Sequence, residues 1–193
     1  MKIQIISRLS GAVLFEHEAE RNTVALTLVA AVKARVNLTD ARLDGASLVG
    51  ANLYGASLVG ANLDGASLVG ANLTDARLDG AKLDGARLVG AKLDGAKLVG
   101  ANLDGEILNK APISLLNLHW PVLITSQYMR IGCQRHTHKE WGAFTNREIK
   151  SMAPGAISFW RKWKAPLLAL CDINHEVLVA TDPVGTESEE EKA

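Results

Sequence analysis

The sequence predicts an all-β solenoid, a stack of short coils that carries a cap at each end. Two observations predict the coils: Leu recurs at every fifth position, and Gly stands at a fixed place in almost every five-residue unit. A third observation predicts the caps, because both features are lost before residue 36 and after residue 105. We expect a β-hairpin and a helix in the N-terminal cap and mainly α-helices in the C-terminal cap.

The five-residue period spans residues 36–105 without a break. Leu occupies every fifth position from Leu38 to Leu103, fourteen times in all. Ala stands two positions before each Leu, except in the first unit, where Val takes its place. Gly stands two positions after Leu in twelve units, and Asp40 and Asp75 replace it in the other two.

Neither an α-helix nor a flat strand fits this period. In a helix, which turns about 100° per residue, a step of five places successive Leu residues about 140° apart, so no apolar face forms. In a strand, an odd step sends successive Leu residues to opposite faces. A coil that turns a corner every five residues keeps every Leu and Ala inside. Gly suits such a corner because it tolerates a positive φ, and Asp is among the better substitutes.

The tandem units, of the form A(N/S/R/K)LxG, resemble the pentapeptide repeat family over about 70 residues. Members of that family are right-handed quadrilateral β-helices with twenty residues per coil and with Leu and Ala stacked inside. The resemblance therefore implies a four-sided β-helix here. In the flanks, the segments GAVLFE, APIS, HWPVLIT and IGCQRHTHKEW are similar to those of phage and prophage pentapeptide repeat proteins, a likeness that implies no established activity.

If four units make one coil, every fourth unit shares a face, and the residue after each Leu points outward. One face then carries a column of carboxylates: Asp44, Asp64, Asp84 and Asp104. Another face carries an apolar column: Val49, Val69 and Val89. The Val column is either ordinary strand-like surface or an interaction surface, since exposed apolar strips mark interfaces.

The carboxylate column raises another possibility, because some pentapeptide repeat proteins mimic DNA and bind type II topoisomerases. Residues 36–105 contain eight Asp against six Lys or Arg, a net charge of −2. Duplex DNA carries one charge per ~1.7 Å of its axis, so a mimic needs dense charge of one sign. The mixed charge of the repeats disfavours topoisomerase-directed mimicry.

Residues 1–35 are not repeats and form the predicted N-terminal cap. The runs KIQIIS and AVLFE flank a turn at residues 8–11 and indicate a β-hairpin. Asn22 or Thr23 is expected to cap a helix that follows. The apolar side of this helix carries Val24, Leu28, Val32 and Val36.

The repeat register continues in degraded form over residues 106–133, where we expect a wider terminal coil or a short sheet, with Cys133 in the inward column. Residues 134–182 predict a helical C-terminal cap. Within it, Thr145 and Glu148 match a capping box, and a later helix carries Trp160, Trp163, Leu167 and Leu170 on one side. Residues 183–193 are interpreted as a disordered acidic tail.

Few residues could carry chemistry. The sequence contains no nucleophile elbow, phosphate loop or dinucleotide fingerprint, so it indicates neither an enzyme nor a cofactor. Weak candidates for zinc ligation are Cys133, His136 and His138, with Cys171 and His175 as further ligands if the last helix folds back. Their spacing matches no standard zinc finger, and we expect no metal site.

Residues 106–172 hold nine Lys or Arg, four acidic residues and all four Trp. Basic residues close to Trp, namely Arg161, Lys162 and Lys164, could contact a protein, stack on single-stranded nucleic acid or lie on an anionic membrane. The simpler interpretation is that the Trp residues pack the cap while the cations face solvent. We expect no membrane association.

The chain has 21 Lys or Arg residues and 21 Asp or Glu residues. This balance argues against a protein that binds phosphate groups over its whole surface and against a polyanionic protein. Two distant Cys and no visible secretory signal suit a cytoplasmic protein. These features favour a non-enzymatic scaffold for protein–protein interaction or self-association through the caps, with an unidentified partner. The alternative is a nucleic-acid-associated regulator that acts through the basic Trp-rich cap or through topoisomerase-directed mimicry.

Overall fold

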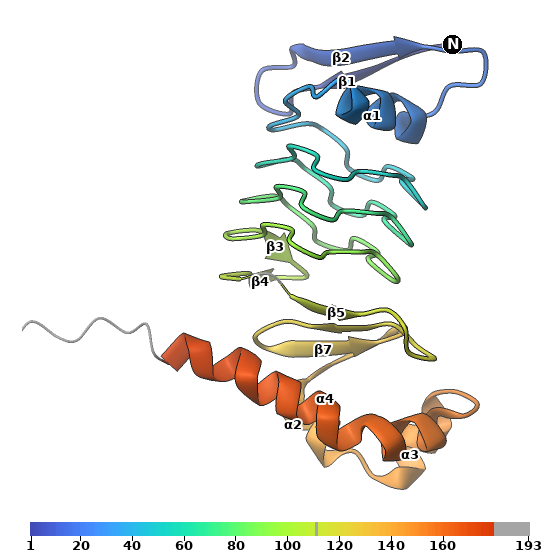
Figure 1. Cartoon of the computed structure of the whole chain (residues 1–193), viewed down its shortest axis with the longest axis vertical. Helices are drawn as coiled ribbons and strands as arrows, with labels where there is room; N and C mark the ends of the chain where they lie inside the picture. The colour runs from blue at the N-terminus through green and yellow to red at the C-terminus, as the bar shows by residue number, and fades with distance from the viewer. Residues whose placement is uncertain (111, 180–193) are drawn as a thin grey trace, which may run out of the picture.

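The computed structural model describes residues 1–110 and 112–179, with side chains up to residue 172. Figure 1 shows three layers along the long axis of the molecule: a hairpin with a helix, a stack of coils, and a sheet backed by helices. The two outer layers therefore lie at opposite ends of the stack.

The N-terminal layer begins with a β-hairpin, as predicted from the sequence. Strand β1 (Lys2–Ile6) pairs antiparallel with β2 (Val13–Glu18). Gly11, in the turn between them, has a φ of 71°, which a Gly adopts without strain. Ile5 is buried and belongs to the same core as the coils, so the hairpin packs onto the stack.

Helix α1 (Val24–Lys33) packs against both strands of the hairpin and against the core of the stack. Thr23 is its N-cap, and the Thr23 hydroxyl accepts the backbone N–H of Leu26 at 3.1 Å. The buried side of the helix consists of Thr27, Leu28 and Ala31. Of the four apolar residues expected on this side, only Leu28 is fully buried, and Val36 lies beyond the end of the helix.

The repeat stack (residues 36–105) pairs each coil with the residues twenty positions later. Parallel bridges such as Asn37–Ser57 recur at this spacing. The N–H of a repeat Leu donates to a carbonyl of the next coil, as from Leu43 to Asn62 at 2.8 Å. One coil therefore contains four units, and its backbone hydrogen bonds come mainly from neighbouring coils.

Leu and Ala fill the inside of the stack. Every repeat Leu from Leu38 to Leu103 is at most 7% exposed. The repeat Ala residues from Ala41 to Ala101 are equally buried, apart from the half-buried Ala46. Full burial of a Leu side chain contributes roughly 1.5–3 kcal/mol. The Leu column is therefore the main source of stability in the repeats.

The corners of the coils adopt a positive φ. Asp40 and Asp75, which replace Gly in the repeat, have φ values of 58° and 57°. Asp tolerates this conformation better than most residues, which explains the exchange. At the first corner Arg35 has a φ of 55°, a conformation that is strained for a long side chain.

Two corner Gly residues lie next to an Asp corner of the preceding coil. A Cβ atom on Gly95 would lie 2.2 Å from Asp75 Oδ1, and one on Gly60 would lie 2.6 Å from Asp40 Oδ1. A Cβ atom on Gly65 would meet no atom within 4 Å. An Asp corner therefore favours Gly at the matching corner of the next coil.

Arg8 ties the hairpin to the first two coils. The Arg8 backbone N–H donates to the Asp40 carbonyl at 2.8 Å, and Arg8 Nε donates to the Gly60 carbonyl at 2.7 Å. The Arg8 guanidinium also lies 3.3 Å from Asp40 Oδ1. Asp40 therefore forms a corner and also docks the N-terminal cap.

The parallel pairing ends at a two-residue hairpin, in which β3 (Asn102–Leu103) pairs antiparallel with β4 (Glu106–Ile107). Leu108 still points into the core and is 2% exposed. The stack therefore keeps its apolar interior for one unit beyond the strict repeats.

Glu106 stands where the repeat would place Ala, and it is 3% exposed. The Glu106 carboxylate accepts the Thr125 hydroxyl at 2.5 Å, the Ser126 hydroxyl, and the Gln127 backbone N–H at 3.2 Å. A buried carboxylate needs such donors, because an unpaired one is costly. Glu106 thus links the last coil to the segment that follows it.

That segment is a four-stranded antiparallel sheet, in chain order, of β5 (Ile113–Leu115), β6 (Val122–Ile124), β7 (Tyr128–Ile131) and β8 (Gln134–Thr137). Of the two alternatives for residues 106–133, a wider coil or a short sheet, the structure has the sheet, and it continues past residue 133. Without Gly corners the chain makes hairpins instead of five-residue turns.

Three helices lie on the far side of this sheet (Figure 1): α2 (His138–Ala143), α3 (Asn146–Met152) and α4 (Ala156–Val179). Sheet and helices enclose a second core, separate from that of the stack. Its largest buried members are Trp141, Phe159 and Trp160, which pack with aliphatic residues such as Ile124 and Leu167.

Capping boxes begin two of these helices. Thr145 and Glu148 form the predicted box at α3, with both reciprocal bonds present. Thr137 and Glu140 form a second box at α2, which the sequence analysis did not identify. Helix α4 continues through Pro166. The predicted acidic tail, residues 183–193, lies outside the described residues.

Replacing Leu68 with Asp should prevent cooperative folding, because it would place an unpaired carboxylate inside the Leu column. Thermal melting followed by circular dichroism should show no cooperative transition. The control Ser67→Ala, at the half-buried neighbouring position, should melt like the parent chain. A cooperative melt of Leu68→Asp would contradict the role assigned to this column.

Gly95→Ala should destabilise the stack more than Gly65→Ala. Both substitutions place a Cβ at positive φ, which costs about 1 kcal/mol, but only the first meets Asp75 and adds an overpacking cost of about 1–3 kcal/mol. Urea unfolding measures both changes. Adding Asp75→Gly to Gly95→Ala should remove the excess, and equal losses in the two single variants would refute the explanation.

Glu106→Gln should weaken the junction between stack and sheet by about 1–3 kcal/mol, since the amide group brings its own N–H donors toward the Thr125 and Ser126 hydroxyls. Urea unfolding monitored by Trp fluorescence reports on the C-terminal core. Asp94→Asn, at an exposed repeat position, is the matched control and should change stability by less than about 0.5 kcal/mol. Similar losses in both variants would be evidence against the junction.

Candidate interaction surfaces

The Asp column lies along one face of the stack and is hydrogen-bonded within it. Asp64 Oδ1 accepts the backbone N–H of Asp84 at 3.0 Å, and Asp84 Oδ1 accepts that of Gly105 at 2.9 Å. Asp84 Oδ2 also accepts the Asn102 amide at 2.7 Å. These bonds join successive coils, so the carboxylates stabilise the stack itself. Asp44, at the N-terminal end of the column, is exposed.

Asp104 ends the column and connects it to the C-terminal sheet. Its Oδ2 lies 2.5 Å from the Arg130 guanidinium on β7 and 3.6 Å from Arg135 Nε on β8. Its Oδ1 accepts the Gly85 backbone N–H at 3.1 Å. Two cations therefore offset the charge of the column at this end, which does not suit a dense acidic surface.

The Val column is only partly exposed. Val49 is 58% exposed, whereas Val69 and Val89 are half-buried. Val99, the other strongly exposed repeat Val at 57%, belongs to a different column. The apolar surface of the repeats consists of separated residues, which is ordinary for a soluble surface.

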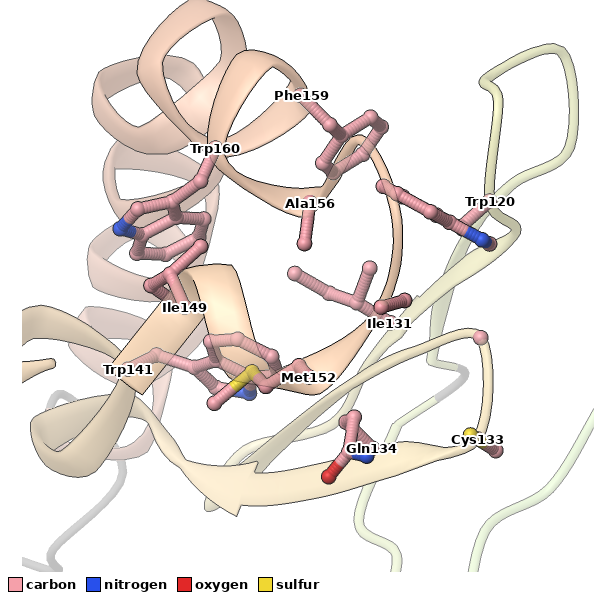
Figure 2. Close-up of a pocket in the computed structure, with 12 residues that line it drawn as sticks. Trp120, Ile131, Cys133, Gln134, Trp141, Ile149, Met152, Ala156, Phe159 and Trp160 are labelled. Atoms are coloured by element: carbon pink, nitrogen blue, oxygen red, sulfur yellow. The ribbon is translucent and has the colours of Figure 1, made fainter. Parts of the chain in front are cut away.

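The C-terminal core contains a small cavity between sheet and helices. Figure 2 shows its aromatic lining, with Trp120, Phe159, Trp160 and Trp141 arranged around Ile131. The cavity volume is about 80 Å³. Sites for drug-sized ligands measure roughly 300–1,000 Å³, so this cavity is a packing gap.

The three basic residues singled out in α4 have different surroundings. Lys164 is half-buried: its Nζ donates to the Gly142 carbonyl at 2.9 Å and lies 5.7 Å from the Trp160 ring. Lys164 therefore holds α4 against α2. Arg161 and Lys162 are exposed, and Lys162 Nζ lies 5.3 Å from the Trp163 ring centroid.

Beside Lys162 the surface is hollowed into an open groove of about 450 Å³, the α4 groove. It is lined by Asn117, Leu118, His119, Gly155, Ser158, Phe159, Lys162 and Trp163. The loop before β6 forms one wall and α4 forms the other. The sequence analysis did not identify this groove, because no spacing along the chain relates the two walls.

The residues considered for zinc are not gathered into a site. Cys133 was expected in an inward column but is exposed, because it follows β7 in a tight turn rather than in a coil. His136 packs edge to face against Trp141 and Phe144 at centroid distances of 5.2 and 4.8 Å. Within residues 1–110 and 112–172, no three His, Cys, Asp or Glu are placed to hold a metal.

Cys171 is a buried thiol of the second core. Burial raises its pKa to about 12, with a smaller contribution from the charge of Asp172. A thiol with this pKa stays protonated at neutral pH and is a poor nucleophile and metal ligand. The side chain of His175, the remaining candidate, is outside the described part of the chain.

The sequence analysis missed the residues that join the two caps to the stack. They are Arg8, Glu106, Arg130 and Arg135. Only Glu106 left a signal in the sequence, since it replaces Ala in an otherwise regular register.

Among the described helices, none has both the length and the apolarity needed to cross a bilayer.

Comparison with known proteins connects this geometry to a family. The family model for pentapeptide repeats matches residues 34–70 and 71–108, in eight copies. No curated protein matches the chain.

Three solved structures are similar in sequence to the repeats. HetL, a pentapeptide repeat protein involved in heterocyst differentiation regulation in the cyanobacterium Nostoc, is 34% identical over 34% of this chain and 40% of its own, at a TM-score of 0.30. Rfr23, a pentapeptide repeat protein of the cyanobacterium Cyanothece, is 39% identical over 34% of this chain and 42% of its own, at a TM-score of 0.24. A further pentapeptide repeat protein from Nostoc is 34% identical over 47% of this chain and 88% of its own, at a TM-score of 0.21.

The chain spans less than half the length of the first two of these proteins. The chain covers most of the third protein at 34% identity. The pentapeptide repeat model matches the repeat stack of the chain from end to end. The chain belongs to the pentapeptide repeat family.

Proposed function

We propose that the chain is a non-enzymatic scaffold: a right-handed quadrilateral β-helix that holds two caps apart and binds a protein partner through the C-terminal cap. Pentapeptide repeat proteins are generally non-enzymatic repeat scaffolds. Three of the four carboxylates of the Asp column, Asp64, Asp84 and Asp104, already bond within the stack or to the C-terminal sheet, which favours the caps as binding surfaces.

The α4 groove is the observation that carries this proposal. It combines the aromatic rings of Phe159 and Trp163 with the exposed cation Lys162. Aromatic residues and Arg are enriched at protein interfaces, where they act as anchors. A partner segment with an apolar anchor and a carboxylate would fit this surface.

An enzymatic role has less support at the same place. Ser158 and His119 both line the α4 groove, but no hydrogen bond joins them, so the nucleophile has no base to activate it. The aromatic cavity nearby is too small for a typical substrate.

An affinity pull-down with the full chain, read by mass spectrometry, tests the proposal. Trp163→Ala combined with Lys162→Glu should reduce recovery of specific partners at least tenfold, since hot-spot residues dominate an interface. Lys97→Glu, an exposed cation of the repeats, is the matched control and should leave recovery unchanged. Truncation at residue 134 is unsuitable, because β8 completes the sheet. Unchanged recovery with the groove variant would contradict the proposal.

Nucleic-acid binding is the second candidate, and the pairing of Lys162 with Trp163 favours it. Fluorescence anisotropy with a single-stranded oligonucleotide at 50–500 mM salt distinguishes the two. Phosphate contacts lose affinity steeply with salt, and base stacking requires a free Trp face. Binding that falls with salt and is lost in Trp163→Ala would establish this alternative. The charge pairing of Asp104 leaves topoisomerase-directed mimicry with less support than either.

A further inference from the structure

A second open groove lies at the opposite end of the molecule, between α1 and the first coils, and measures about 480 Å³. Its apolar lining consists of Val29, Val32, Val36 and Ala56. Lys33, Arg35 and Tyr54 add two cations and an aromatic ring, and Asn52, Gly55 and Ser57 complete it. We call it the α1 groove. Among the residues that the structure describes, no acidic side chain lines it.

Both cations of the α1 groove are exposed on the described surface. Lys33 is exposed in the last turn of α1. Arg35 is also exposed and stands, at a φ of 55°, where the repeat corners carry Gly or Asp. A strained conformation of this kind is retained where the surroundings require it. Tyr54 is 56% exposed, and its hydrogen bond to Asp75 raises its pKa and orients the ring.

The chain itself contains a segment of complementary charge. Residues 180–193 include five acidic residues and one Lys, and four Glu lie within residues 187–191. Residues 1–179 hold the remaining 20 cations and 16 acidic residues, an excess of positive charge. The negative charge that makes the chain neutral is thus concentrated in one short run.

The position of this run favours binding between molecules. Helix α1, which forms one wall of the α1 groove, and helix α4 belong to the layers at opposite ends of the stack (Figure 1). From Val179 to Glu189 the chain has ten residues, which span roughly 35 Å at full extension. The acidic run of a second copy is not subject to this limit on reach.

We propose that the acidic segment 186–192 of one copy binds the α1 groove of a second copy, with Glu side chains on Lys33 and Arg35. The result is head-to-tail association in which every copy offers one groove and one acidic segment. The inference rests on the proposed scaffold function and names a second copy of this chain as a partner.

Sedimentation velocity of the full chain tests this proposal. At 50 mM salt the chain should associate with rising concentration, and at 500 mM salt it should be monomeric, because exposed charge pairs are screened. Lys33→Glu should weaken association about tenfold. Lys150→Glu is the matched control, since Lys150 is the exposed basic residue in the last turn of α3, and it should have no effect.

Charge reversal in the acidic segment provides the reciprocal test. The triple variant Glu189→Lys, Glu190→Lys and Glu191→Lys should also weaken association, and mixing it with Lys33→Glu should restore complexes of the two variants. Monomers at all concentrations, or association that ignores either set of substitutions, would overturn the proposal. Partner recovery in the pull-down is measured separately through the α4 groove, so either result leaves the scaffold function independently testable.

Discussion

Each coil of this protein depends on the coil before it and the coil after it. Apart from the bond from each repeat Ala N–H to the Leu carbonyl three positions earlier, the backbone partners of repeat residues lie about twenty positions away, in a neighbouring coil. The Leu side chains of all coils are buried in one common core. A single unit therefore has no stable structure of its own. The same dependence makes the two ends vulnerable, because a bare end would expose unpaired backbone groups and apolar side chains.

Both ends are closed by an Arg that reaches from the cap to an Asp of the stack. Arg8 pairs with Asp40 at the N-terminal end, and Arg130 with Asp104 at the C-terminal end. Both Asp residues have a positive φ, at 58° and 52°. Partly buried ion pairs of this type orient their partners more reliably than they add stability. The caps are thus fixed in rotation about the stack as well as in height.

The repeat core could be predicted from the sequence because its geometry depends on a local spacing: Leu and Ala every five residues lie inside, and Asp40 and Asp75 form corners in place of Gly. The C-terminal layer was predicted only in part: helices and the Thr145 box were expected, but the sheet was one of two alternatives, since its hairpins have connections of unequal length. Counting by five placed Cys133 inward, whereas a turn exposes it. The two grooves combine distant segments, such as Leu118 with Trp163, that no sequence period relates.

The repeat units of this chain are nearly identical to one another, so coils can be added or removed without changing the cross-section of the stack. Adding or removing twenty residues changes the height of the stack by ~4.8 Å and keeps the orientation of one cap relative to the other, whereas five residues rotate it by one face. Surface columns lengthen or shorten with every such change, but the α1 and α4 grooves do not, because each is built from a cap and the residues next to it. The two grooves therefore tolerate a variable number of coils, and the stack sets the distance and angle between them.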